Sequence, residues 1–135
     1  MNPEMNYLAV VVGGLVSVAI GALWYSKALF GKAWVAAIGK TEEQVRQDFK
    51  ATKILWAFVL GFFISYGIAR LIVWTGMNTP GGGFLIGLLA AITFVGASMK
   101  VNDLFEGRPC KLFWITWPHH LVELLVIGMI LGAWM

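Results

Sequence analysis

Charged residues are scarce in this sequence, and their scarcity excludes most soluble folds. Lys, Arg, Asp and Glu make up 13% of the 135 residues, whereas soluble domains carry roughly 25%. Hydrophobic residues make up 59% of the chain, and the mean hydropathy is +0.79. Such a chain has too few polar side chains to cover its apolar residues with a water-compatible surface. The composition and length therefore predict one domain, residues 1–135, with the lipid bilayer as its main partner.

Cysteine and familiar catalytic motifs are nearly absent as well. Cys110 is the only cysteine, so an internal disulfide is excluded, and no Cys or His lies beside it at the spacing of a zinc site. Residues 39–41 (GKT) resemble the end of a phosphate-binding loop, but Trp34 occupies the place of its first glycine. We therefore expect no cofactor, and an enzyme is the least favoured class of function.

Four long apolar runs make up most of the sequence. They cover residues 7–25, 54–75, 84 to about 104, and 112–135. A helix that crosses a bilayer needs ~20 mostly apolar residues, and helix is the form in which one such segment satisfies its own backbone hydrogen bonds. The first run is preceded by Glu4 and by no Lys or Arg, so we expect a span and not a cleaved signal peptide. The predicted fold class is all-α, with four transmembrane helices.

The longest connection, residues 26–53, is expected to contain further helix. Its first half carries apolar residues at helical spacing, which predicts a short helix lying in the membrane interface and ending at Gly39. These residues are Leu29, Phe30, Trp34, Val35 and Ile38. Residues 41–44 (TEEQ) form a capping box. We expect the helix that it opens to continue through Phe49 into the second span.

The other two connections are short. Residues 76–83 contain Pro80 and three consecutive glycines, and they are expected to form a tight turn between the second and third spans. Residues 106–109 (EGRP) are expected to turn the chain into the fourth span.

Basic residues are missing from one set of connections and concentrated in the other. The N-terminus, residues 76–83 and the C-terminus have none, whereas six lie in residues 26–53 and three near the last turn. Because cytoplasmic loops of membrane proteins are enriched in Lys and Arg, this distribution predicts that both termini are extracytoplasmic, in the cytoplasmic membrane if the source is bacterial. The net charge of +3 is explained in the same way, so we expect no nucleic-acid partner.

Two short motifs resemble a known family. Residues 21–26 (GALWYS) and 29–34 (LFGKAW) are similar to the signature of the domain-of-unknown-function 1761 family of small membrane proteins. The similarity returns at residues 111–113 (KLF) and 120–122 (HLV), and it extends over nearly the whole chain. The resemblance implies a protein with several membrane spans and draws attention to His120, but it implies no activity.

Small residues recur every four positions within the spans. Such stripes let helix backbones approach closely in lipid. Packing within the chain is the first interpretation, and self-association is the alternative. The face of the fourth span that carries Gly128 and Gly132 lies opposite its polar residues, so we expect it to be free to form a homo-oligomer. The stripes contain Gly13, Ser17 and Gly21, then Gly61 and Ser65, then Gly128 and Gly132.

The fourth span contains an unusual polar stripe. Thr116, His119, His120 and Glu123 fall within one sector of about 100°. Glu123 lies ~16 Å along the helix from the start of the run, near the middle of a bilayer, where an ionisable group needs a protein or water partner. Pro118 also frees one backbone carbonyl in this region.

Three interpretations of this stripe remain open. Glu123 could bond to His119 or His120 and simply hold helices together. The stripe could instead be a proton-linked or cation-binding site. Finally, His119, His120 and Glu123 are suitable ligands for a transition metal, although this is the weakest of the three interpretations.

Other charged residues lie in or near the spans. Arg70 is flanked by Tyr66 and Trp74 and either extends outward to the interface or pairs with Glu123. Lys100 and Asp103 are expected to form an ion pair at the inner end of the third span.

Two classes of function follow from these observations. The first is a small carrier or channel that is proton-linked or moves a cation or small solute, and that works as an oligomer because four spans are few for a transport path. The second is an accessory or structural membrane subunit without a substrate, whose polar stripe docks a partner helix. The sequence does not identify a substrate.

Overall fold

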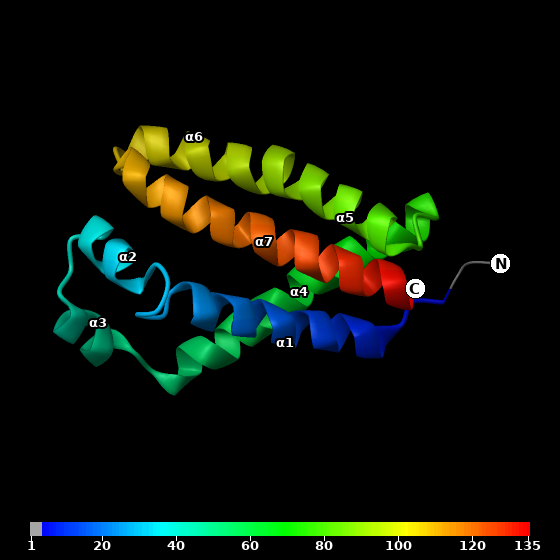
Figure 1. The fold of residues 1–135 in the computed structure, drawn as a ribbon, viewed down its shortest axis with the longest axis horizontal. Coiled ribbons are helices and arrows are strands. Elements are labelled where there is room, and N and C mark those ends of the chain that lie inside the picture. Colours follow the sequence, from blue (N-terminus) through cyan, green and yellow to red (C-terminus); the bar gives the residue numbers. More distant parts are fainter. Residues whose placement is uncertain (1–3) are drawn as a thin grey trace.

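The computed structural model describes residues 4–135, and within them it contains helices and no strands (Figure 1). The elements, in chain order, are α1 (Tyr7–Trp24), α2 (Gly31–Ala37), α3 (Glu42–Asp48), α4 (Ala51–Thr75), α5 (Pro80–Leu89), η1 (Ala90–Gly96), α6 (Ala97–Glu106) and α7 (Cys110–Trp134). The segment η1 is a π-helix, and it joins α5 and α6 into one continuous helix, Pro80–Glu106.

The four predicted spans are confirmed. The helices Tyr7–Trp24, Ala51–Thr75, Pro80–Glu106 and Cys110–Trp134 are 18, 25, 27 and 25 residues long and apolar enough to cross a membrane. Large apolar side chains such as Leu15, Phe63, Phe94 and Trp114 are exposed on their outer faces. These faces fit hydrocarbon and not water, so the chain is a multi-pass membrane protein.

Helix α7 lies at the centre of the bundle. It packs along α5 and also contacts α1 and α4, while α1 and α4 pack on each other. Figure 1 shows α7 between the α5–α6 helix on one side and α1 on the other. The start of α1, the C-terminus and the α4–α5 connection lie at one end of the bundle, and α2, α3 and the α6–α7 turn lie at the opposite end (Figure 1).

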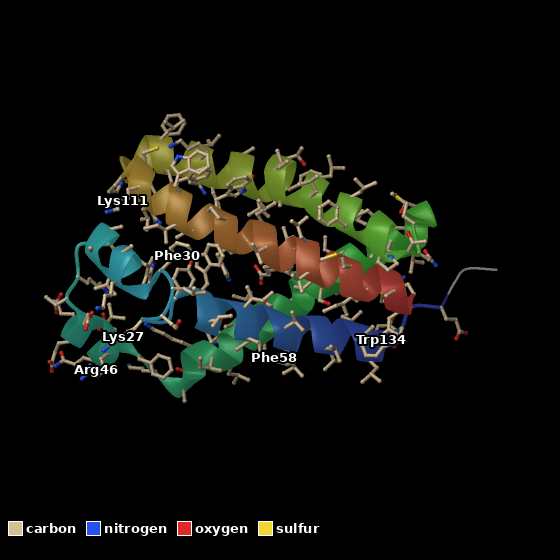
Figure 2. All side chains as sticks on the ribbon, in the orientation of Figure 1. Lys27, Phe30, Arg46, Phe58, Lys111 and Trp134 are labelled. Atoms are coloured by element: carbon tan, nitrogen blue, oxygen red, sulfur yellow. The ribbon has the colours of Figure 1, made fainter. Side chains whose placement is uncertain are left out.

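The basic residues gather at the end that carries α2 and α3. Figure 2 shows Lys27, Arg46 and Lys111 there, with Trp134 at the other end. The fold therefore brings together the two basic connections, which are far apart in sequence. Their assignment to the cytoplasm stays a prediction.

Glycines set the closest helix contacts. A Cβ at Gly83 or Gly87 of α5 would collide with backbone carbonyls of α7, and a Cβ at Gly128 or Gly132 would collide with those of Gly83 and Thr79. The expectation that the Gly128 and Gly132 face is free for a second copy is therefore wrong. That face is covered by α5, which can approach so closely only because both helices lack side chains there.

The first connection differs from its prediction in one respect. Thr41 and Gln44 form the expected capping box. However, α3 ends at Asp48, and the extended backbone of Phe49 and Lys50 separates it from α4, so the expectation of one continuous helix is wrong. The break turns α3 back toward α2, where Asp48 forms an ion pair with Lys40 at 2.8 Å. The hydrogen bond from Lys40 holds the pKa of Asp48 below its usual value.

The expected short helix in this connection is present as α2, Gly31–Ala37. It ends near Gly39, whose φ of 71° is in the left-handed region that favours glycine. Its location in the membrane interface stays a prediction.

The turn between α4 and α5 is shorter than predicted. Gly76, with φ of 70°, ends α4. The hydroxyl of Thr79 then accepts a hydrogen bond from the N–H of Gly82 at 3.0 Å, and Pro80 occupies the first turn of α5, where proline is favoured. The three glycines therefore lie inside the helix and not in the turn, where two of them make room for neighbouring backbone.

Candidate functional site

The carboxyl group of Glu123 lies inside the bundle, bonded to two other side chains. Glu123 is 2% exposed and sits about 20 Å along α7, a helix of roughly 37 Å. Its Oε2 lies 3.0 Å from Nδ1 of His120 on the same helix. Its Oε1 accepts a hydrogen bond from the hydroxyl of Ser17 on α1. The carboxyl group therefore ties α1 to α7 near the middle of the bundle.

The neighbouring imidazole of His119 is buried without a partner. His119 is 8% exposed, and neither of its ring nitrogens has a hydrogen-bond partner among residues 4–135. Its ring centroid lies 4.8 Å from that of His120 and 5.2 Å from that of Tyr25. A buried polar group without a partner costs about 1–3 kcal/mol. A neutral imidazole in this state has one N–H to donate and one nitrogen lone pair to offer to a ligand.

His119, His120 and Glu123 form one compact group of donor atoms. One atom from each residue can be chosen so that all lie within 4.8 Å of one another. The proximity follows from the helix, because positions three and four apart lie on one face and adjacent positions are separated by about 100°. Of the two histidines that the sequence allowed as partners of Glu123, the structure places His120, not His119, against its carboxyl group.

This group lines a cavity between α1, α4 and α7. The cavity has a volume of about 460 Å³. Its walls are largely apolar, and its polar lining comes from a few side chains. The apolar wall includes Val18, Ala22, Ile54, Ala57, Leu60 and Ile64, and the polar lining comes from Ser17, Tyr25, His119, His120 and Glu123.

Small residues and helix crossing explain why the cavity exists. Helices α1 and α4 touch closely where Gly61 faces Ser17 and where Gly14 faces Phe62. The N-terminal part of α4 then diverges from α1 toward the end of the bundle that carries α2 and α3 (Figure 1). Tyr25 lines both this cavity and a pocket between α2 and α3. The cavity therefore extends from Glu123 toward that end.

The opposite end of the bundle is tightly packed. Its largest fully buried side chains include Val10, Ile72, Ile127 and Leu131, which come from α1, α4 and α7. Close-packed apolar side chains leave little room for water. The cavity therefore ends near Glu123 on the side of the C-terminus, while Ile54 and Leu60 of its apolar wall are exposed on the surface of the bundle.

Two predicted polar contacts are not formed. Arg70 donates from Nε to the hydroxyl of Tyr66 at 2.9 Å and lies over its ring at 5.2 Å. It forms no ion pair with Glu123 within the described residues, so the pairing alternative is wrong. Tyr66 is one turn away on the same helix and holds the guanidinium in a groove next to Trp74, outside the cavity.

The expected ion pair between Lys100 and Asp103 is also wrong for the part of the chain that the structure describes. Lys100 instead approaches α7, with its ammonium 3.7 Å from Sγ of Cys110 and 5.1 Å from the ring centroid of Phe113. Asp103 faces the protein and is buried.

The remaining residues of the polar and small-residue stripes are placed as follows. The hydroxyl of Thr116 bonds to the carbonyl of Leu112 on its own helix at 2.9 Å, so it makes no link between helices. Gly13 faces Ser65, and Gly21 faces His119, with 3.5 Å between a Cβ built on Gly21 and Nε2 of His119. A Cβ at Gly21 would therefore make only ordinary van der Waals contact with the imidazole.

Sequence reasoning missed the role of Ser17 and the position of Tyr25. Ser17 was assigned only to helix packing, but its hydroxyl bonds to Glu123. The sequence carried part of this information, because a serine within a stripe of small residues can also donate a hydrogen bond. Tyr25 gave no signal, since its contact with His119 depends on how α1 and α7 pack.

The comparisons with known proteins agree with this architecture. A family model described as "Protein of unknown function (DUF1761)" matches residues 8–132. The match covers nearly all of the four spans, and it confirms the resemblance of the motifs around Trp24 and Trp34. No curated protein and no solved structure matches the chain.

Proposed function

We propose that this chain, which belongs to the DUF1761 family of proteins of unknown function, is a small membrane carrier or channel for a cation. The cation enters the cavity from the end that carries α2 and α3. It is held near the middle of the bundle by Glu123 and the two histidines. The observation that supports this proposal is the position of a buried carboxyl group and an unpartnered imidazole at the end of the cavity that is closed toward the C-terminus.

The chemistry of the cavity favours a cation. Its polar lining contains one carboxyl group and two imidazoles but no Lys or Arg. In an environment of low dielectric constant, a carboxylate attracts a positive charge more strongly than it does in water. Binding sites of membrane carriers commonly lie at this depth, and their access alternates between the two sides. A cavity that extends toward one end of the bundle and is packed at the other is consistent with one state of such a cycle.

The burial of the site argues against the accessory subunit. That alternative requires the polar stripe to dock a helix from a partner. Glu123 is instead already enclosed by this chain, with Ser17 and His120 as its partners. A partner helix is therefore not needed to shield the carboxyl group from lipid.

Sidedness and assembly are further parts of the proposal. We propose that the end of the bundle toward which the cavity extends faces the cytoplasm, because it carries the basic connections. A homo-oligomer stays a prediction, and its contact would have to use exposed apolar faces and not Gly128 and Gly132, which α5 covers.

Flux measurements in proteoliposomes test the proposal. Vesicles that contain the wild type, Glu123→Gln or Asp103→Asn are loaded with indicators for protons, K⁺ and Co²⁺. We expect the wild type to conduct at least one of these cations, Glu123→Gln to lose that flux, and Asp103→Asn to keep it. Asp103 is a matched control because it is a buried carboxyl group outside the cavity. Wild-type flux equal to that of empty vesicles for all three cations would reject the carrier and favour the accessory subunit.

A further inference from the structure

The donor set of the cavity indicates which class of cation it binds. We propose that the site binds a divalent transition-metal ion such as Zn²⁺ or Co²⁺, with one nitrogen from His119, one from His120 and a carboxylate oxygen from Glu123 as its protein ligands. The claim that the protein transports such an ion rests on the proposed function. The claim that the site binds the ion does not.

The types of donor atom favour this class of metal. Imidazole nitrogen suits Zn, Cu, Fe and Ni, whereas Mg²⁺ and Ca²⁺ are bound by oxygen. Ca²⁺ takes six to eight oxygen ligands. The side-chain oxygens of the cavity's polar lining are the carboxyl group of Glu123 and the hydroxyls of Ser17 and Tyr25, which are fewer than Ca²⁺ takes. Two nitrogens and one carboxylate are therefore a poor site for Mg²⁺ or Ca²⁺ and a common one for a transition metal.

The spacing of the donor atoms fits a single ion. Bonds from Zn²⁺ to histidine nitrogen and carboxylate oxygen are about 2.0–2.2 Å long, which places tetrahedral ligands about 3.4 Å apart. The three chosen donor atoms lie within 4.8 Å of one another, and Nδ1 of His120 is already 3.0 Å from Oε2 of Glu123. The third donor, a nitrogen of His119, lies within the same 4.8 Å and would have to approach the other two donors to bind the same ion.

His119 supplies the independent observation that points to a ligand. Both of its nitrogens are buried and have no hydrogen-bond partner within the described chain, although the side chain lines the cavity. If His119 served only to pack helices, an apolar side chain would fill the same space without the cost of unsatisfied nitrogens. A metal ion would use one of these nitrogens directly.

The arrangement also fits an ion that is exchanged. Structural zinc sites have four protein ligands, whereas sites with three leave a position open for water or another ligand. Here three protein ligands face a cavity, so the open position points into it. The hydroxyl of Ser17 donates to the other carboxylate oxygen, as outer partners of metal ligands commonly do to fix their orientation.

Titration of the purified protein with Co²⁺ tests the inference. Binding is measured by calorimetry, and the ligand type is measured from the visible and near-ultraviolet absorption of the bound Co²⁺. We expect one ion per chain with the spectrum of nitrogen and oxygen ligands, and displacement of Co²⁺ by Zn²⁺. His119→Ala and Glu123→Gln should each weaken binding by at least about 100-fold. Ser17→Ala should weaken it by roughly 10–100-fold, as expected for an outer partner.

Two control variants test whether Co²⁺ binds outside the cavity. Cys110 is an exposed thiol that could bind Co²⁺ adventitiously, and Cys110→Ser removes it. Asp103→Asn removes a buried carboxyl group outside the cavity. Both should bind Co²⁺ as the wild type does. No binding, a thiolate spectrum, or binding that survives His119→Ala and is lost in Cys110→Ser would overturn the inference. Because the spectrum of Cys110→Ser alone identifies the ligand type, the test does not depend on the folding of the other variants.

The results separate this inference from the proposed function. Co²⁺ binding without flux of any cation would keep the metal site and reject the carrier. Flux of protons or K⁺ by a protein that binds no Co²⁺ would keep the carrier and reject the metal site.

Discussion

The hydroxyl of Ser17 donates a hydrogen bond to the carboxyl group of Glu123, across 106 positions of the sequence and from α1 to α7. This contact predicts that alanine substitution has different effects on stability at two buried serines, Ser17 and Ser65. Ser17→Ala would leave Oε1 of Glu123 without its donor, and we expect a loss of about 1–3 kcal/mol in the free energy of unfolding. The loss can be measured as a lower melting temperature in detergent.

Ser65→Ala is the matched control. Ser65 is also fully buried next to α1, but its Oγ has no hydrogen-bond partner among residues 4–135. Removing this hydroxyl should therefore leave the melting temperature unchanged or raise it. Equal destabilisation by both substitutions would contradict a specific role for the bond between Ser17 and Glu123.

The contact between α5 and α7 predicts opposite effects for two glycines of one segment. A Cβ at Gly83 would collide with the carbonyl of Gly128, whereas a Cβ at Gly81 would meet no described atom within 4 Å. We expect Gly83→Ala to cost about 1–3 kcal/mol or more through overpacking. Gly81→Ala should be neutral or should stabilise the helix by up to about 1 kcal/mol. Thermal unfolding of both variants in detergent tests this, and a tolerated Gly83→Ala would mean that the two helices are not in backbone contact.

The distribution of basic residues predicts the orientation in the membrane. With Cys110 replaced by Ser, a cysteine at position 81 should react with a thiol reagent that cannot cross membranes when it is added to intact cells. A cysteine at position 43 should react only after the cells are opened. Both positions are exposed in the structure, so accessibility within the protein does not limit either reaction. The reverse pattern would place both termini in the cytoplasm.

The spans and the capping box could be predicted because both depend on local sequence. An uncharged run of about 20 residues matches the thickness of a bilayer, and Thr41 and Gln44 cap a helix three residues apart. The pairing of His120 with Glu123 also depends on local sequence, since both residues lie on one helix face.

Other features depend on how the helices pack, and sequence could not supply them. The stripe of Gly128 and Gly132 indicates a close approach but not the partner, which is α5 of the same chain. The break at Phe49 had no local signal, because neither Phe49 nor Lys50 is a strong helix breaker. The π-helix η1 has no clear local signal either, but its Ala91 carbonyl accepts a hydrogen bond from the indole of Trp117 on α7 at 2.9 Å.

The most direct test of the central claim is the position of a bound metal in an experimental structure. Crystals of the Cys110→Ser protein grown with Co²⁺ would be measured at the cobalt absorption edge, and the anomalous difference map would locate the ion. The account predicts one strong peak in the cavity, about 2.0–2.2 Å from a nitrogen of His119 and an oxygen of Glu123. A map without a peak there, or a structure in which the carboxyl group of Glu123 faces lipid, would contradict it.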